Sequence, residues 1–188
     1  MVKVGSRRKQ WKELFSVLEV GSQVVYGIHG VCHITAEEVR LVDRKRIRYF
    51  VLEPDVATSA KFYIPAENPV ALSKLRSIIS KEELDALLSS SEIRKNCWIE
   101  DENRRKQRYR ELIASGDRMA LLQMIHSLRA HKRAQEELGR KFHLCDENFL
   151  RDAEKLLDAE FAFTLGIKPE DVEEYILKAM ELPAETTK

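Results

Sequence analysis

The sequence predicts an α+β protein whose strands and helices lie in segregated domains, and three observations indicate this class. Residues 20–65 contain short β-branched and aromatic segments bounded by Gly and Pro, with apolar and polar positions alternating. Beyond Pro69 the apolar spacing changes to about 3.6 residues, which is the helical period. The 188 residues suffice for two small domains, each with its own core. We therefore expect a small antiparallel β-barrel of the Tudor or SH3 type, followed by a compact C-terminal bundle of about five helices.

The strand domain is expected to span residues 15–69, after an N-terminal extension at residues 1–14. Alternation of polar and apolar side chains is clear over residues 46–52, which predicts a half-buried strand. Pro54 interrupts this pattern before residues 60–64 resume it. Barrels of this size are usually binding modules, because their exposed edge strands accept strands or loops of a partner.

The helical domain is expected to span residues 70–188. Ser80 and Glu83 have the spacing of a capping box, in which each side chain bonds the backbone N–H of the other residue. Two aspartates are placed as N-caps and two glycines as helix ends: Asp117, Asp146, Gly116 and Gly166. Pro169 suits the first turn of a last helix.

Catalytic and metal-binding patterns are scarce in this chain. The sequence contains no glycine-rich phosphate loop and no HExxH motif, and its five histidines are scattered. The three cysteines are too far apart for a CxxC zinc site. We therefore expect neither enzymatic activity nor a cofactor or metal. No apolar run approaches the roughly 20 residues of a membrane helix, and the first residues lack the apolar core of a signal peptide. A cytoplasmic location without membrane contact is expected.

The basic residues are concentrated in the middle of the chain. Residues 94–141 carry 13 Lys and Arg against 7 Asp and Glu, whereas residues 142–188 carry 5 against 12. A local basic surface attracts phosphate, although a basic run on a long helix is also typical of a solvated face. The candidate DNA-binding residues on this helix are Arg104, Arg105, Arg108 and Tyr109. Spacings of three and four residues would place them in one band that contacts DNA phosphates without reading the base sequence.

Trp98 lies just before this basic helix and has two interpretations. An aromatic ring beside a basic surface stacks on an unpaired base or inserts into a minor groove. A tryptophan between Cys97 and Ile99 is equally typical of a core residue.

Several segments match a known family in their order and spacing. The matching segments are Val20–Tyr26, His29–Val31, Tyr49–Leu52, Ile64–Asn68, Leu75–Arg76 and Leu112–Asp117. In these segments the chain after residue 14 resembles the CarD/CdnL family of bacterial RNA polymerase-binding transcription regulators. The resemblance implies a Tudor-like barrel, shared with the transcription-repair coupling factor, that binds the β subunit of RNA polymerase.

The resemblance also implies how the helical domain acts. In the family this domain contacts promoter DNA at the upstream edge of the melted bubble, mainly through the backbone and the minor groove, and a Trp acts as a wedge that stabilises the open complex. The expected protein is then a monomeric transcription regulator that associates with the nucleoid through the polymerase.

Carried over to this chain, the polymerase contact falls on the barrel. Arg40 matches a family position whose basic side chain faces the polymerase, and Tyr63 matches a second position where some members have Arg. Three nearby cations either strengthen this contact or form a solvated strand face: Lys61, Arg46 and Arg48.

The wedge position falls on Trp98, about one helical turn farther from the 115–117 motif than in actinobacterial members of the family. Residues 100–102 fill that turn with three acidic side chains, which repel phosphate. Either a longer loop delivers Trp98 to DNA, or Trp98 is a packing residue. A protein-interaction adaptor that binds polymerase or another partner without DNA contact is the alternative function.

Overall fold

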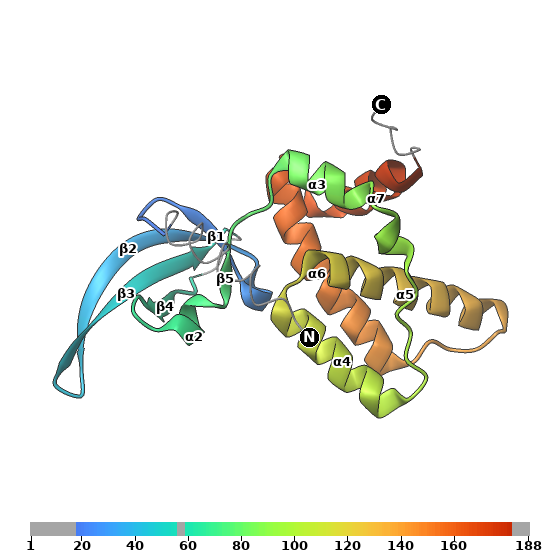
Figure 1. The fold of residues 1–188 in the computed structure, drawn as a ribbon, viewed down its shortest axis with the longest axis horizontal. Helices are drawn as coiled ribbons and strands as arrows, with labels where there is room; N and C mark the ends of the chain where they lie inside the picture. Colours follow the sequence, from blue (N-terminus) through green and yellow to red (C-terminus); the bar gives the residue numbers. More distant parts are fainter. Residues whose placement is uncertain (1–17, 56–58, 182–188) are drawn as a thin grey trace. The chain divides into compact units, whose positions relative to one another are not determined.

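The structure is a computed structural model that describes residues 18–55 and 59–181 (Figure 1). The predicted extension at residues 1–14 lies outside the described residues. The chain forms two compact units, Met1–Ile78 and Ile79–Lys188. We placed the boundary after residue 69, whereas the structure divides the chain between Ile78 and Ile79, because a short fifth strand still belongs to the sheet.

The first unit is built around one antiparallel sheet, with strand order β4-β3-β2-β1-β5. The strands are β1 (Gln23–Tyr26), β2 (Val31–Val42), β3 (Lys45–Pro54), β4 (Phe62–Pro65) and β5 (Leu75–Arg76). A 3-10 turn η1 (Gly27–His29) joins β1 to β2, and a short helix α2 (Pro69–Leu72) precedes β5. The predicted antiparallel strand domain is confirmed.

The sheet is strongly curved, as contacts between distant strands show. In the strand order, β2 and β3 separate β1 from β4. Even so, the ring centroids of Tyr26 in β1 and Phe62 in β4 lie 5.3 Å apart, and the ring of His29 lies 4.2 Å from that of Phe62. These aromatic side chains therefore bring strands β1 and β4 together in the way that a small barrel requires.

Strands β2 and β3 form a long hairpin that extends well past the rest of the sheet (Figure 1). Its turn residues Asp43 and Arg44 have φ of 49° and 62°, as a two-residue turn that matches the twist of the strands requires. The inner end of the hairpin contributes Ile34, Phe50 and Leu52 to the sheet core, whereas its outer end is exposed. The hairpin therefore presents side chains on both faces of the sheet.

Within residues 79–181 the second unit contains five α-helices, which confirms the predicted number. They are α3 (Lys81–Leu88), α4 (Glu102–Ser115), α5 (Arg118–Glu137), α6 (Leu144–Leu165) and α7 (Val172–Glu181). Two 3-10 turns, η2 (Ser91–Arg94) and η3 (Pro169–Asp171), precede α4 and α7. The core contains fully buried side chains from several helices, among them Leu84, Tyr109, Leu128, Leu157 and Phe161.

Most of the predicted helix boundaries are confirmed. Ser80 and Glu83 form the capping box at α3, and Asp117 accepts the backbone N–H of Ala120 at the start of α5. The prediction for Asp146 is wrong, because α6 already begins at Leu144 with His143 as its N-cap. Asp146 lies in the first turn of α6, where its carboxylate is buried against Arg105.

The first residue of the helical unit is fixed to α6 by a buried carboxylate. Glu160 is fully buried, and its Oε1 accepts the backbone N–H of Ile79 at 3.1 Å. The same oxygen accepts Nε of Arg118 at 3.0 Å. One turn further along α6, the hydroxyl of Thr164 donates to the carbonyl of Ile79 at 2.9 Å. Both backbone groups of Ile79 are thus satisfied by side chains of α6.

Replacing Glu160 should destabilise the helical unit. Glu160→Ala removes a buried acceptor used by a backbone N–H and by a guanidinium, so we expect a loss of about 3 kcal/mol in the free energy of unfolding. Urea denaturation followed by circular dichroism measures this loss. The matched control is Glu170→Ala, whose exposed carboxylate forms an ion pair with exposed Lys168 and should change stability by less than about 0.5 kcal/mol. Equal effects of the two substitutions would contradict the role assigned to Glu160.

Candidate interaction surfaces

An exposed cation and an aromatic ring meet on the outer face of the sheet. The guanidinium carbon of Arg40 in β2 lies 3.5 Å from the ring centroid of Tyr63 in β4. Glu38 accepts Nε and Nη2 of Arg40 at 3.0 and 2.9 Å, and this hydrogen bonding is the main reason why the pKa of Arg40 is raised. The guanidinium is therefore held over the ring although it faces solvent.

Lys61 belongs to the same neighbourhood. Its ammonium group contacts Glu53 at 2.8 Å, and this hydrogen bond is the main cause of its raised pKa. The charges of Tyr63 and Glu38 act on Lys61 in the same direction. The structure thus brings together three of the five predicted polymerase-contact residues, Arg40, Tyr63 and Lys61.

The other two predicted residues, Arg46 and Arg48, lie on the opposite face of the hairpin. Arg40 of β2 pairs with Ile47 of β3, and Arg46 and Arg48 are the residues on either side of Ile47 in β3. Paired residues share a face and consecutive residues alternate, so the register separates both arginines from Arg40. Arg48 forms an ion pair with Glu37 at 3.1 Å on that face.

The predicted band of basic residues on α4 needs a correction. Arg105 is 6% exposed and Tyr109 is fully buried, whereas Arg104 and Arg108 face solvent. Adjacent helical residues are rotated by about 100°, so the two pairs occupy different faces of the helix. Burial raises the pKa of the Tyr109 hydroxyl, in keeping with its place in the core. Arg105 and Tyr109 are thus inaccessible to a phosphate in this structure.

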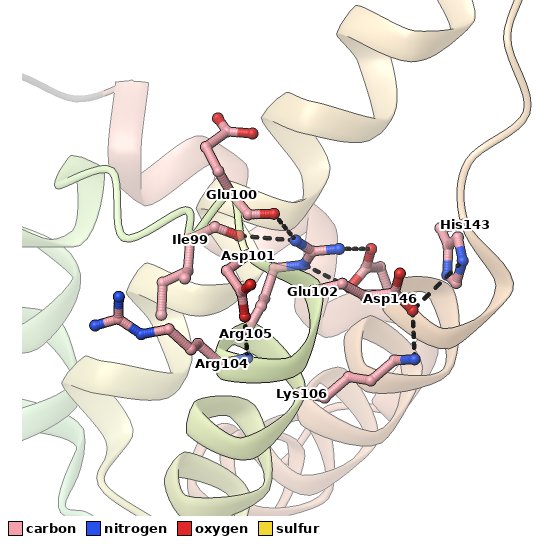
Figure 2. A network of polar contacts seen from close by, with 9 residues as sticks. All are labelled: Ile99, Glu100, Asp101, Glu102, Arg104, Arg105, Lys106, His143 and Asp146. Atoms are coloured by element: carbon pink, nitrogen blue, oxygen red, sulfur yellow. Dashed lines mark hydrogen bonds and ion pairs between the residues drawn. The ribbon is translucent and has the colours of Figure 1, made fainter.

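Arg105 holds the start of α4 against the start of α6 (Figure 2). Its Nε and Nη2 donate to the two oxygens of Asp146 at 3.0 and 2.9 Å. Its Nη1 donates to the carbonyls of Ile99 and Glu100 at 2.7 and 3.1 Å. One buried guanidinium therefore joins two helices and the loop before α4, and its hydrogen bonds to Asp146 raise the pKa of Arg105.

Trp98 packs beside this network. Its ring stacks on His131 of α5 with centroids 3.6 Å apart, and the guanidinium carbon of Arg105 lies 4.2 Å from the ring centroid. The indole N–H is buried without a hydrogen-bond partner among the described residues. The geometry is that of a packing residue at the edge of the helical core, which was one of the two interpretations of the sequence.

Two acidic residues at the start of α4, Asp101 and Glu102, have local partners. Asp101 is the N-cap of α4 and accepts the backbone N–H of Arg104. Glu102 pairs with Lys106, and this hydrogen bond is the main reason why the pKa of Glu102 is lowered. Figure 2 shows His143 on the other side of the same carboxylate, with 3.8 Å between Nε2 and Oε1. Much of the acidic charge near Arg104 is therefore engaged locally.

The sequence contains a pattern from which the burial of Arg105 could have been predicted. Tyr109 and Leu112 are spaced three residues apart, and the same stripe extended by one turn reaches position 105. The charge of Arg105 concealed this stripe, because an arginine is rarely buried without an ion-pair partner. That partner, Asp146, is distant in sequence.

The described residues carry few other functional groups. In residues 18–55 and 59–181, no helix combines the length and the apolar character needed to cross a membrane. In the same ranges, no group of three or more His, Cys, Asp and Glu side chains is placed to hold a metal ion.

The described residues thus form a curved sheet that carries the Arg40–Tyr63 contact, followed by a bundle of helices. Residues 18–78 match the family model of the CarD-like/TRCF RID domain. The sheet domain of this chain is therefore similar to the CarD-like/TRCF RID domain over these residues. The comparison with curated proteins gives no match.

The family match agrees with the structure in its extent. It covers all five strands and ends at Ile78, which is also the last residue of the first compact unit. The resemblance inferred from the sequence is confirmed for this domain.

Breaking the buried ion pair should destabilise the helical unit. Asp146→Asn keeps the shape of the side chain but leaves the Arg105 guanidinium buried without its counter-charge, so we expect a loss of about 3 kcal/mol in unfolding free energy. Chemical denaturation gives this value. Asp152→Asn makes the same chemical change at an exposed position of α6 and should be nearly neutral. A stable Asp146→Asn protein would show that the pair does not hold α4 to α6.

Proposed function

We propose that this protein is a transcription regulator that binds the β subunit of RNA polymerase through its sheet domain and contacts promoter DNA through its helical unit, which stabilises the open complex. The match of residues 18–78 to an RNA polymerase-interacting domain is the observation that carries the proposal. The proposed location is the cytoplasm, at the nucleoid, and the proposed stoichiometry is a monomer.

The polymerase contact is proposed to centre on Arg40 and Tyr63. Arg and Tyr are enriched among residues that dominate binding energy at protein interfaces. Glu38 already orients the guanidinium, so little side-chain entropy is lost when a partner binds. Lys61 adds positive charge to this surface, whereas Arg46 and Arg48 are on the other face and are left out of the contact.

The DNA contact is proposed to use Arg104 and Arg108, which are exposed one turn apart on α4. Guanidinium groups bind phosphates without reading sequence, and such contacts are weak at physiological salt. The sheet domain compensates for this weakness, because binding to polymerase raises the effective concentration of the helical unit near the promoter. The open complex gains stability only through a higher affinity of the protein for that state than for the closed state.

A second candidate function is an adaptor that binds polymerase without touching DNA. The packing of Trp98 favours it, because the indole would have to leave His131 and Arg105 before it could enter a minor groove. The burial of Arg105 and Tyr109 favours it as well, because two of the candidate DNA-binding side chains are inaccessible.

The polymerase contact is tested with two arginine variants on opposite faces of one hairpin. We expect Arg40→Ala to weaken binding to the isolated β subunit by about tenfold, because it removes the group held over Tyr63. Arg46→Ala removes the same charge from the other face and should leave the dissociation constant within about twofold. Calorimetric titration measures both. Equal weakening by the two variants would indicate an effect of net charge and contradict the proposed surface.

The DNA contact is tested by the salt dependence of binding to a duplex with a melted bubble. Removing Arg104 and Arg108 together should reduce the slope of log affinity against log salt by about 2, since each phosphate contact contributes about 0.9. The control removes Arg151 and Lys155, which are exposed at the same spacing on α6. An unchanged slope in the first variant rules out this contact.

Open-complex lifetime separates the regulator from the adaptor. With polymerase saturated, the wild-type protein should lengthen the lifetime, and both Arg40→Ala and the variant lacking Arg104 and Arg108 should lose the effect. If the wild-type protein binds the β subunit but leaves the lifetime unchanged, the adaptor is the better account. A folded Trp98→Ala protein that keeps the full effect would assign Trp98 to packing.

A further inference from the structure

The helical unit contains a small cavity that neither proposed interaction uses. It has a volume of about 100 Å³, is partly open to solvent and lies among α5, α6, α7 and η2. Its apolar wall includes Leu122, Ile125, Leu157 and Ile176. An engineered apolar cavity of about 150 Å³ accepts benzene, so this one suits an alkyl group of about four carbons.

Two polar groups in the wall lack partners within the described part of the chain. Asp158 is partly buried and has no hydrogen bond or ion pair there. His126 lines the same cavity, and its Nδ1 is buried with no hydrogen-bond partner. Buried polar groups are normally satisfied, so the unpaired Nδ1 of His126 in the same wall as the partly buried carboxyl group of Asp158 indicates a position for a ligand that provides hydrogen bonds.

The charged side chains around the cavity indicate whether that ligand is a cation, an anion or a neutral compound. Arg129 is shared between Glu154 at 2.6 Å and Glu173 at 2.8 Å, so its charge is already matched by two carboxylates. Asp158 adds a third carboxyl group, whereas Arg133 in the same wall is exposed and screened by water. The ionised carboxylate of Asp158 would repel a bound anion, and a neutral compound would cover this carboxylate without supplying a counter-charge.

We propose that this cavity binds a small aliphatic ammonium compound, with the alkyl group against the apolar wall and the ammonium group paired with Asp158. An ammonium group has three N–H donors, which allows it to serve the carboxylate and an unprotonated Nδ1 of His126 together.

Proton linkage gives this site a distinctive pH dependence. Burial, with a smaller effect of Glu154, raises the pKa of Asp158 to about 7. The charged groups around it are Arg129 and Arg133 of α5, Glu154 of α6 and Glu173 of α7. Burial and the charges of Arg133 and Arg94 lower the pKa of His126, which favours its neutral form. A cation favours the ionised form of Asp158, so its affinity rises as the pH increases through about 7.

The test compares three probes of one shape on the full chain: n-butylammonium, n-butanol and n-butyrate. Binding is followed by nuclear magnetic resonance, from the methyl signals of Leu122 and Ile176 in the cavity wall. At pH 8 we expect n-butylammonium to bind about tenfold more tightly than n-butanol, as a charge-assisted hydrogen bond implies, and n-butyrate to bind least. At pH 6 the preference for n-butylammonium over n-butanol should shrink.

Two variants test whether Asp158 is the group that binds the ammonium. Asp158→Asn should abolish both the preference for n-butylammonium and its pH dependence, whereas Asp152→Asn, at an exposed position of the same helix, should preserve both. Equal affinities of n-butylammonium and n-butanol for the wild-type protein at pH 8 would overturn the proposal. So would the same pH-dependent preference in Asp158→Asn, or the absence of shifts at the cavity methyl groups.

Discussion

A guanidinium and a carboxylate that are both almost inaccessible to water, those of Arg105 and Asp146, organise the helical unit around its candidate DNA-binding edge. The charge of each is costly to bury alone, so the pair is held in one geometry by the hydrogen bonds of both partners. That geometry fixes the loop before α4, because the remaining donors of Arg105 take its two carbonyls, and it supplies one of the contacts of Trp98. The exposure of Arg104 and Arg108 on the other face of α4 follows from the same constraint.

Local patterns in the sequence were sufficient for most of the fold. The capping box at Ser80 and the end of α4 at Gly116 each depend on residues within a few positions of one another, and both are as predicted. The errors involve distant partners. Arg105 looked like a surface cation because its counter-charge is in another helix, and for the same reason Asp146 looked like an N-cap. The fifth strand was missed because its two residues, Leu75 and Arg76, are too few to show an alternation of polar and apolar side chains. They form a strand only because they pair with β1.

The predicted polymerase-contact residues lie on two opposite faces of the sheet, which their spacing in the sequence alone does not reveal. All five lie in or beside three neighbouring strands, yet the register assigns Arg46 and Arg48 to the face opposite Arg40. A single hairpin therefore carries two chemically different surfaces. One has a guanidinium held over an aromatic ring, and the other combines cations with Val39 and Leu41, which are 63% and 72% exposed. The family match identifies the domain, and the strand register decides which of its side chains act together.

The attachment of Ile79 to Glu160 and Thr164 has a mechanical consequence. Ile79 follows directly on the last residue of the sheet unit, so any tension between the two units enters the helical unit at this residue. Glu160 and Thr164 lie in the last two turns of α6, so a load at Ile79 passes into this part of α6 and does not pull only on the start of α3.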